Sequence, residues 1–187
     1  MRTPRTKRRM IGAMKKMVSD EKKTGPSPSK VSHEHPCTID LDLQIESTAP
    51  DIPEKSFFED CTRRVLSSFR NHAELTIRLV DAEESRELNR RWRGINEPTN
   101  VLSFPVEGLE HAVPDLLGDV VICIALAHAE ADANGIARKA HWAHLIAHGI
   151  LHLLGFDHDK ESQAREMEDK EHAILSDMGY PYPKFAC

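Results

Sequence analysis

Five of the eleven histidines lie in one short segment, residues 141–159, with the sequence HWAHLIAHGILHLLGFDHD. Two of them, His148 and His152, are four residues apart, so on a helix their side chains lie one above the other on one face. Imidazole nitrogens at this spacing can share a metal ion, for which nitrogen–zinc distances are about 2.0–2.1 Å. Gly155 is a natural helix end, after which the chain can turn back and bring in His158. The spacing therefore predicts a metal site at the end of a helix.

His144 is the alternative third ligand, because it lies on the same predicted helical face. With a rise of about 1.5 Å per residue, His144 and His152 are about 12 Å apart along the helix axis, with His148 between them. His158 approaches from another direction, so we favour His148, His152 and His158, and interpret His144 as a core histidine or a neighbour of the ligands. Three nitrogen ligands leave a fourth zinc position open for water, as in catalytic sites. We therefore expect one zinc ion per chain and a hydrolytic reaction.

The residue after the first histidine limits the type of hydrolase. The spacing His-x-x-x-His-x-x-Gly-x-x-His matches the ligand pattern of metzincin proteases, which place a general-base Glu directly after the first His. In this chain that position is Gly149. The metal scaffold of such a peptidase is therefore predicted without its base, and an atypical metallopeptidase stays only as an alternative.

A second group of chemically active residues precedes the histidines. Four arginines lie within eight residues, at Arg86, Arg90, Arg91 and Arg93. On a helix, positions 86, 90 and 93 share one face, while Leu88 and Trp92 form another. The group is either a solvated face that packs through Leu88 and Trp92, or a clamp for phosphate, whose oxygens guanidinium groups bind in pairs. The residues alone leave both interpretations open.

The elements that position these groups follow from the hydrophobic pattern. Alternating or short apolar runs predict strands at residues 38–46, 75–80, 101–105 and 119–124. Helical patterns predict helices at residues 53–70, 81–92, 125–134, 137–154 and 161–178. Asp81 is the expected N-cap of the second helix, with Glu84 completing a capping box, and Gly135 and Gly155 are expected helix ends. The order indicates an α+β (α/β-like) fold, a small mixed sheet of about four strands with packed helices.

Charge and composition divide the chain into a tail and a domain. Residues 1–30 carry a formal charge of +8 and the remainder −13, for a net charge of −5. Residues 1–37 are basic and then rich in Pro, Ser and Gly, which predicts a disordered tail. A nucleic-acid-binding arm, an organelle transit peptide or an unused upstream start codon are the alternatives. Residues 38–187 are predicted to form a single domain, whose acidic charge requires a local patch, or the tail, for any contact with RNA.

Cysteine usage and hydropathy indicate a cytoplasmic protein. The four cysteines, Cys37, Cys61, Cys123 and Cys187, contain no C-x-x-C pair, which argues against a disulfide framework or a cysteine zinc site. No apolar run approaches the roughly 20 residues that a membrane span needs. The N-terminus shows no secretory hydrophobic region. We therefore expect no membrane partner.

Three long segments resemble a known family. The histidine segment HGILHLLGFDHD is similar to the signature of the YbeY endoribonuclease family. Residues 89–105, NRRWRGINEPTNVLSFP, and residues 117–123, LGDVVIC, resemble two further blocks that occur in the family in the same order. The resemblance covers about residues 40–180. It has two departures, since Phe156 stands where the family commonly has Tyr and the basic tail is not part of the family core.

The resemblance implies a specific activity. It implies a zinc-dependent, single-strand-specific endoribonuclease that acts in small-subunit ribosomal RNA maturation and ribosome quality control. It also implies metal ligands at His148, His152 and His158, and a role in RNA binding or catalysis for Arg93. We therefore expect His148 and Arg93 to be the catalytic residues. Ribosomal RNA is then the expected partner, with ribosomal proteins as further partners. The general base is left open between Asp157, Asp119 and water activated by the metal.

A non-catalytic function is the competing interpretation. A ribosome-assembly factor with a structural zinc ion could bind ribosomal protein or RNA without cleaving it. The acidic domain suits contact with basic ribosomal proteins at least as well as contact with RNA. Thr99, Asn100 and Ser103, in the second family-like block, are expected to hold backbone geometry in either case.

Overall fold

Nine helices and strands occur in the residues that the computed structural model describes, 37–108 and 112–180. The strands are β1 (Thr38–Ile45), β2 (His72–Val80), β3 (Val101–Pro105) and β4 (Leu116–Cys123). The helices are α1 (Lys55–Leu66), α2 (Ala82–Arg93), α3 (Ile124–Ala133), α4 (Arg138–Leu153) and α5 (Glu161–Asp177). The predicted α+β fold with a four-stranded sheet is confirmed. The predicted tail, apart from Cys37, lies outside the described residues.

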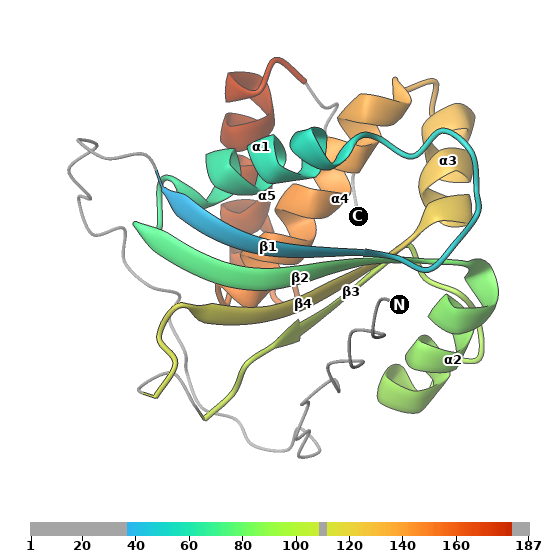
Figure 1. The fold of residues 1–187 in the computed structure, drawn as a ribbon, viewed down its shortest axis with the longest axis horizontal. Helices are drawn as coiled ribbons and strands as arrows, with labels where there is room; N and C mark the ends of the chain where they lie inside the picture. Colours follow the sequence, from blue (N-terminus) through green and yellow to red (C-terminus); the bar gives the residue numbers. More distant parts are fainter. Residues whose placement is uncertain (1–36, 109–111, 181–187) are drawn as a thin grey trace, which may run out of the picture.

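The four strands form one mixed sheet in the order β1-β2-β4-β3 (Figure 1). Strands β1, β2 and β4 are parallel, and β3 is antiparallel to β4 at the sheet edge. The parallel pairing explains why β2 begins at His72 rather than at residue 75 as predicted. His72 pairs with Thr38 at the start of β1, so the partner strand extends β2 into residues without an apolar signal.

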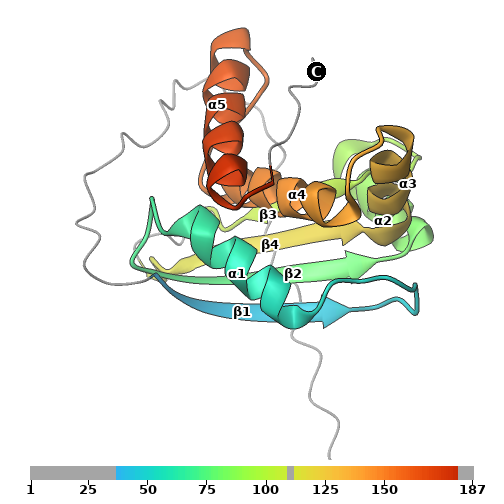
Figure 2. The same cartoon turned by 90° about the horizontal axis from the view of Figure 1, so that it is seen from above.

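On one face of the sheet lie α1 and α4, with α3 and α5 packed against α4, and α2 lies on the other face (Figures 1 and 2). Alternate residues of β2, such as Leu75 and Ile77, are fully buried beneath the larger helical layer. The helices contribute Phe58 and Trp142 to this core. Their rings pack edge to face, with the ring centroids 5.7 Å apart. Burying these large side chains is the main stabilising contribution. Each removes apolar surface from water, which stabilises the fold by on the order of 1.5–3 kcal/mol.

Helix α2 packs on the opposite face through a small apolar cluster. Val80, Leu102 and Val121 are buried there, with Leu88 of α2 packed against them. The N-cap of α2 is Asp81, as predicted, and its carboxylate accepts a hydrogen bond from the Glu84 N–H at 2.9 Å. Only this half of the capping box forms.

The second hydrogen bond of the capping box, from the Asp81 N–H to the Glu84 side chain, is replaced by a contact between Glu84 and strand β2. The Glu84 side chain accepts two hydrogen bonds from the guanidinium of Arg78, at 2.8 and 3.0 Å, instead of returning to the cap. Arg78 lies on β2 and is only 19% exposed, so its charge needs a partner on this face. An ion pair between sheet and helix therefore replaces a local cap.

The predicted helix ends at glycines are confirmed by their backbone. Gly135 has φ 64° and Gly155 has φ 89°, both in the left-handed region that favours glycine. Cys37, Cys61 and Cys123 are free and buried. Among the described residues, no helix has the length and apolar character needed to cross a membrane.

Candidate metal centre

Three histidines meet at the end of α4. His148 and His152 come from the last turns of the helix, and His158 follows the turn at Gly155. One ring nitrogen from each of the three lies within 4.8 Å of the other two. The Nε2 atoms of His148 and His152 are only 3.1 Å apart. We call this group the histidine cluster; it contains the three residues that the sequence predicts as ligands.

Hydrogen bonds at the far side of two rings decide where their protons lie. His148 Nδ1 is 2.7 Å from a carboxylate oxygen of Glu171, and His152 Nδ1 is 3.0 Å from the carbonyl oxygen of Phe156. A carbonyl and an ionised carboxylate only accept hydrogen bonds, so each Nδ1 must carry the proton and donate it. In the neutral imidazoles both Nε2 atoms are then unprotonated.

Two unprotonated nitrogens facing one another fit a cation between them. At 3.1 Å without a proton or an ion, the two Nε2 lone pairs of His148 and His152 would repel. In a tetrahedral zinc site, nitrogen ligands at about 2.0–2.1 Å from the metal are about 3.3 Å from one another. The spacing and the proton positions of this pair therefore suit a metal ion.

Burial keeps His152 in the form that binds metal. Desolvation, together with the positive charge of neighbouring His148 and His158, lowers the pKa of His152 to about 4. For Glu171, burial raises the pKa, but hydrogen bonds from His144 and His148 outweigh it and bring the pKa to about 2. At neutral pH His152 is thus uncharged and Glu171 is ionised, as ligand and carboxylate acceptor need to be.

The turn that brings in His158 is fixed by a buried aromatic ring. The Phe156 N–H donates to the Leu151 carbonyl at 3.0 Å, while the Phe156 side chain is only 5% exposed. Its ring packs edge to face on Phe69 at 5.7 Å. Because its backbone N–H and its ring are both held in place, the Phe156 carbonyl can accept the hydrogen bond from His152. The chain then continues to His158, two residues later. The position that commonly holds Tyr in the resembled family is used here for packing.

His144 belongs to a different group from the one that His158 joins. Its Nε2 lies 3.4 Å from the second carboxylate oxygen of Glu171, and His144, His148 and Glu171 form a second set with potential metal-binding atoms. The sequence reasoning did not include Glu171, which lies on α5. A signal was present, because Glu171 is buried on the same helical stripe as Met167 and Leu175. A carboxylate on the apolar face of a helix requires a partner.

At Gly149, helix α4 lies close against the sheet. A β-carbon at this position would lie 2.6 Å from Val120 Cγ1 and 3.4 Å from Ser103 Oγ. The Ser103 hydroxyl donates to the Gly149 carbonyl at 3.0 Å. A Glu at position 149, as in metzincin proteases, would be directed into the sheet and away from the histidine cluster.

The predicted catalytic residue Arg93 belongs to a helix on the opposite face of the sheet from α4. It ends α2, which packs on the face opposite α4 (Figure 1). Within the described residues, no hydrogen bond, ion pair or ring contact joins Arg93 to the histidine cluster. The structure therefore does not bring Arg93 together with the three histidines in one contact group.

The arginines of α2 differ in their partners. Arg86 and Arg90 form ion pairs with Glu83 and Glu87, at 2.7 and 2.8 Å. Arg91 lies over the ring of Trp92, 5.2 Å from its centroid. Arg93 is exposed, and no described acidic residue pairs with it. The arginine group is thus divided into neutralised and available members.

The two aspartates considered as general base differ in their position relative to the cluster. Asp157 Oδ1 accepts the backbone N–H of His158 at 2.7 Å, which commits one of its oxygens to the turn. Asp119 pairs in register with Thr76 and Phe104, and its neighbour Val120 faces α4, so Asp119 lies on the opposite face. Asp157 nevertheless lies beside the cluster, because one of its carboxylate oxygens is within 4.8 Å of a His158 ring nitrogen, whereas the sheet separates Asp119 from the histidines.

Asn100 and Thr99 hold backbone and helix geometry, as expected. The Asn100 amide donates to Glu130 of α3 at 3.1 Å, and Glu130 also lies 2.8 Å from Nε2 of buried His141. The Thr99 N–H donates to the Ser85 hydroxyl, which in turn donates to the Thr99 carbonyl. These contacts fix the segment before β3 between α2 and α3.

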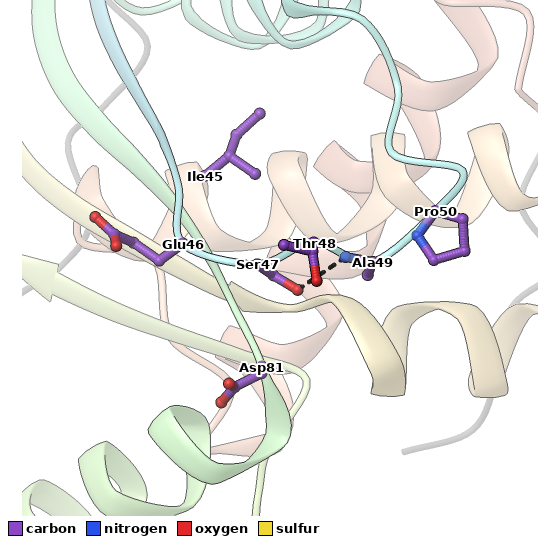
Figure 3. A pocket seen from close by; sticks show the side chains of 7 residues that line it. All are labelled: Ile45, Glu46, Ser47, Thr48, Ala49, Pro50 and Asp81. Atoms are coloured by element: carbon purple, nitrogen blue, oxygen red, sulfur yellow. Dashed lines mark hydrogen bonds between the residues drawn. The ribbon is translucent and has the colours of Figure 1, made fainter.

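A surface pocket of about 780 Å³ lies elsewhere, at the carboxyl ends of β1 and β2 (Figure 3). Its lining consists of residues that end β1, the loop after it and the cap of α2: Ile45, Glu46, Ser47, Thr48, Ala49, Pro50 and Asp81. The Ala49 N–H donates to the Ser47 hydroxyl across its floor. No residue of the histidine cluster lines it, so the pocket and the candidate metal centre are separate.

Comparison with known proteins gives a family and a fold. The family model described as endoribonuclease YbeY matches residues 43–179. The solution structure of TM1509 from Thermotoga maritima is similar with a TM-score of 0.53 and 23% identity, over 73% of this chain and 87% of that one. At this identity the structural likeness concerns the fold.

Proposed function

Since the chain belongs to the endoribonuclease YbeY family, we propose that it cleaves single-stranded ribosomal RNA at a zinc ion held by His148, His152 and His158. Family membership makes it a nuclease hydrolase that acts on RNA. We propose further that it acts in maturation of small-subunit ribosomal RNA and in ribosome quality control, with residues 38–187 as the catalytic domain. The free, buried cysteines suit a reducing compartment such as the cytoplasm.

One observation carries the metal dependence. The Nε2 atoms of His148 and His152 face one another at 3.1 Å while both Nδ1 atoms are committed as donors. A cation relieves the resulting repulsion, and His158 supplies a third nitrogen from the exposed side. Three protein ligands with an accessible side are the arrangement of catalytic zinc sites.

The chemistry divides between the metal and the chain. When bound, zinc polarises a phosphoryl oxygen and lowers the pKa of water to about 7. The chain orients His148 through Glu171 and His152 through the Phe156 carbonyl, and burial lowers the pKa of His152 so that this ring stays neutral. Asp119 lies on the opposite face of the sheet, which leaves Asp157, beside His158, as the aspartate candidate for the general base.

Arg93 supports the proposal as a contact for RNA phosphate. It is exposed and has no described acidic partner, and unlike Arg91 it does not lie over the Trp92 ring. The edge strand β3 separates it from the histidine cluster, since α4 packs on one face of β3 and Trp92 packs on Phe104 at the other. An RNA strand that contacts both must therefore cross the edge of β3. In this arrangement Arg93 binds and orients the RNA beside the edge of β3.

One surface favours a second function as a non-catalytic assembly factor. The sheet face beside α2 carries the exposed carboxylates Asp40 and Asp42 on β1, next to Glu46, which pairs with Arg78. Such a surface suits basic ribosomal proteins and repels RNA. Both functions can reside in one chain, because this face lies opposite the histidine cluster. The peptidase alternative loses support from Gly149, where no side chain fits.

The test is cleavage of ribosomal RNA by the full chain with zinc, with and without a chelator. We expect cleavage at defined sites that chelator abolishes and added zinc restores. His148→Ala should lose both zinc and cleavage, whereas His172→Ala on α5, outside both histidine groups, should keep both. Binding of RNA without cleavage would favour the assembly factor. A duplex of the same sequence, expected to resist cleavage, tests the single-strand preference.

A further inference from the structure

A carboxylate from α5 reaches two histidines of α4. Glu171 is 9% exposed and lies between His144 and His148, with one oxygen 3.4 Å from His144 Nε2 and the other 2.7 Å from His148 Nδ1. Helices α4 and α5 pack against one another along this contact. The carboxylate is 23 residues from His148 in sequence, so only the folded arrangement brings them together.

The charge of Glu171 determines what it does to His148. An ionised carboxylate accepts hydrogen bonds and donates none, so the proton between the two groups belongs to His148 Nδ1. A charge-assisted bond of 2.7 Å holds both the proton and the plane of the ring. The other nitrogen, Nε2, is left unprotonated and points toward His152.

The two helical histidines are held in corresponding ways by different partners. His152 Nδ1 donates to a backbone carbonyl, that of Phe156, within the same turn of chain. His148 Nδ1 donates to a charged side chain from a separate helix. A carboxylate raises the basicity of the imidazole it holds more than a neutral carbonyl does, because it stabilises positive charge on the ring.

We propose that Glu171 is a positioning residue that fixes the tautomer and orientation of His148 for the metal. The inference rests on the metal centre of the proposed function. It adds α5 to the parts of the chain on which metal affinity depends. Glu171 acts through His148 and does not itself bind the metal.

Direct ligation by Glu171 is the competing role, because His144, His148 and Glu171 form a second set of potential metal-binding atoms. The 2.7 Å between Glu171 and His148 Nδ1 favours a hydrogen bond. Two ligands of one zinc ion would be separated by about 3.3 Å, the distance set by tetrahedral geometry. Because His148 Nδ1 donates its proton to Glu171, it has no lone pair left to bind a metal ion.

The first measurement is zinc affinity of the full chain by competition with a chromophoric chelator. We expect Glu171→Gln, which keeps the shape and loses the charge, to weaken zinc binding about 10–100-fold. Glu171→Asp, which keeps the charge, should recover part of the loss. Glu166→Gln, an exposed position on the same helix, is the matched control and should bind zinc as the wild type does. Unchanged affinity in Glu171→Gln would overturn the role of Glu171.

The second measurement is the tautomer of His148, from long-range nitrogen–proton NMR correlations of the metal-free protein. We expect the Nδ1–H form in the wild type and a shift toward the Nε2–H form in Glu171→Ala. If that variant does not fold, the wild-type spectrum decides, because an Nε2–H form there overturns the inference. Wild-type protein that binds no zinc at all would instead overturn the proposed function, while this spectrum would still test the contact.

Discussion

Gly149 of α4 and Val120 of β4 are packed so closely that a β-carbon on the glycine would lie 2.6 Å from Val120 Cγ1. This contact fixes the height of α4 above the sheet, and with it the position of the histidines on either side of Gly149. Glycine within a helix costs about 1 kcal/mol relative to alanine. The close approach of helix and strand offsets that cost.

The first prediction is that Gly149→Ala destabilises the fold. The added methyl group forces overpacking against a stiff β-branched side chain, at a cost of about 1–3 kcal/mol that exceeds the gain in helix propensity. Chemical denaturation should show a lower free energy of unfolding. In the double variant with Val120→Ala, the loss of unfolding free energy should be smaller than the sum of the two single losses by more than about 0.5 kcal/mol. Simple additivity would contradict the contact.

The second prediction separates His158 from His144. His158 shares the histidine cluster with His148 and His152, whereas His144 contacts Glu171. His158→Ala should weaken zinc binding by more than the roughly 10–100-fold expected for an outer partner, and His144→Ala by no more than that range. Isothermal titration with zinc measures both. A larger effect of His144→Ala would show that the wrong third ligand was chosen.

The third prediction concerns the salt dependence of RNA binding. Arg93 has no described acidic partner, whereas Arg90 is paired with Glu87 at 2.8 Å. Arg93→Ala should therefore lower the slope of log affinity against log salt by about 1. Arg90→Ala, the matched control, should change the slope much less, because its charge is already neutralised. Fluorescence anisotropy at several salt concentrations measures the slopes, and equal effects would exclude a special role for Arg93.

The fourth prediction is a pH dependence of stability at Glu130. Burial raises the pKa of this carboxyl, but hydrogen bonds from His141 and Asn100 outweigh it, so the pKa lies below its ordinary value of 4.5. A pKa lowered on folding adds stability above pH 4.5, which is lost as the pH falls through the folded value. Wild-type protein should exceed Glu130→Gln in stability by about 1 kcal/mol at pH 7.

The difference between these two proteins should narrow below pH 4.5, where the wild-type carboxyl becomes protonated. Thermal denaturation of both proteins across this range provides the measurement. A difference that stays constant with pH would mean that the charge of Glu130 contributes nothing to its hydrogen bonds.

Local features were accessible from the sequence because their causes are local. The spacing of His148 and His152, and the glycine that ends their helix, lie within one segment whose geometry follows from helical periodicity. The same holds for Asp81, whose carboxylate caps the helix that follows it. Each of these depends on residues only a few positions apart.

Features that depend on packing between distant elements were not accessible. Glu171 meets His148 only because α5 folds onto α4, and no local pattern predicts that pairing. The capping box was predicted whole, but Arg78 of β2 takes the Glu84 carboxylate. The position of Arg93 depends on which face α2 covers, which follows from a strand order that the sequence does not specify.

The span of the histidine cluster has a consequence for the order of folding. Its three histidines lie within residues 148–158, so bringing them together closes a short loop at little cost in chain entropy. Zinc can thus hold the end of α4 and the following turn together before the parallel strands pair. The pairing of parallel strands is the slow step in such topologies. The Glu171 contact, 23 residues away, is then made last, when α5 docks onto a centre that already exists.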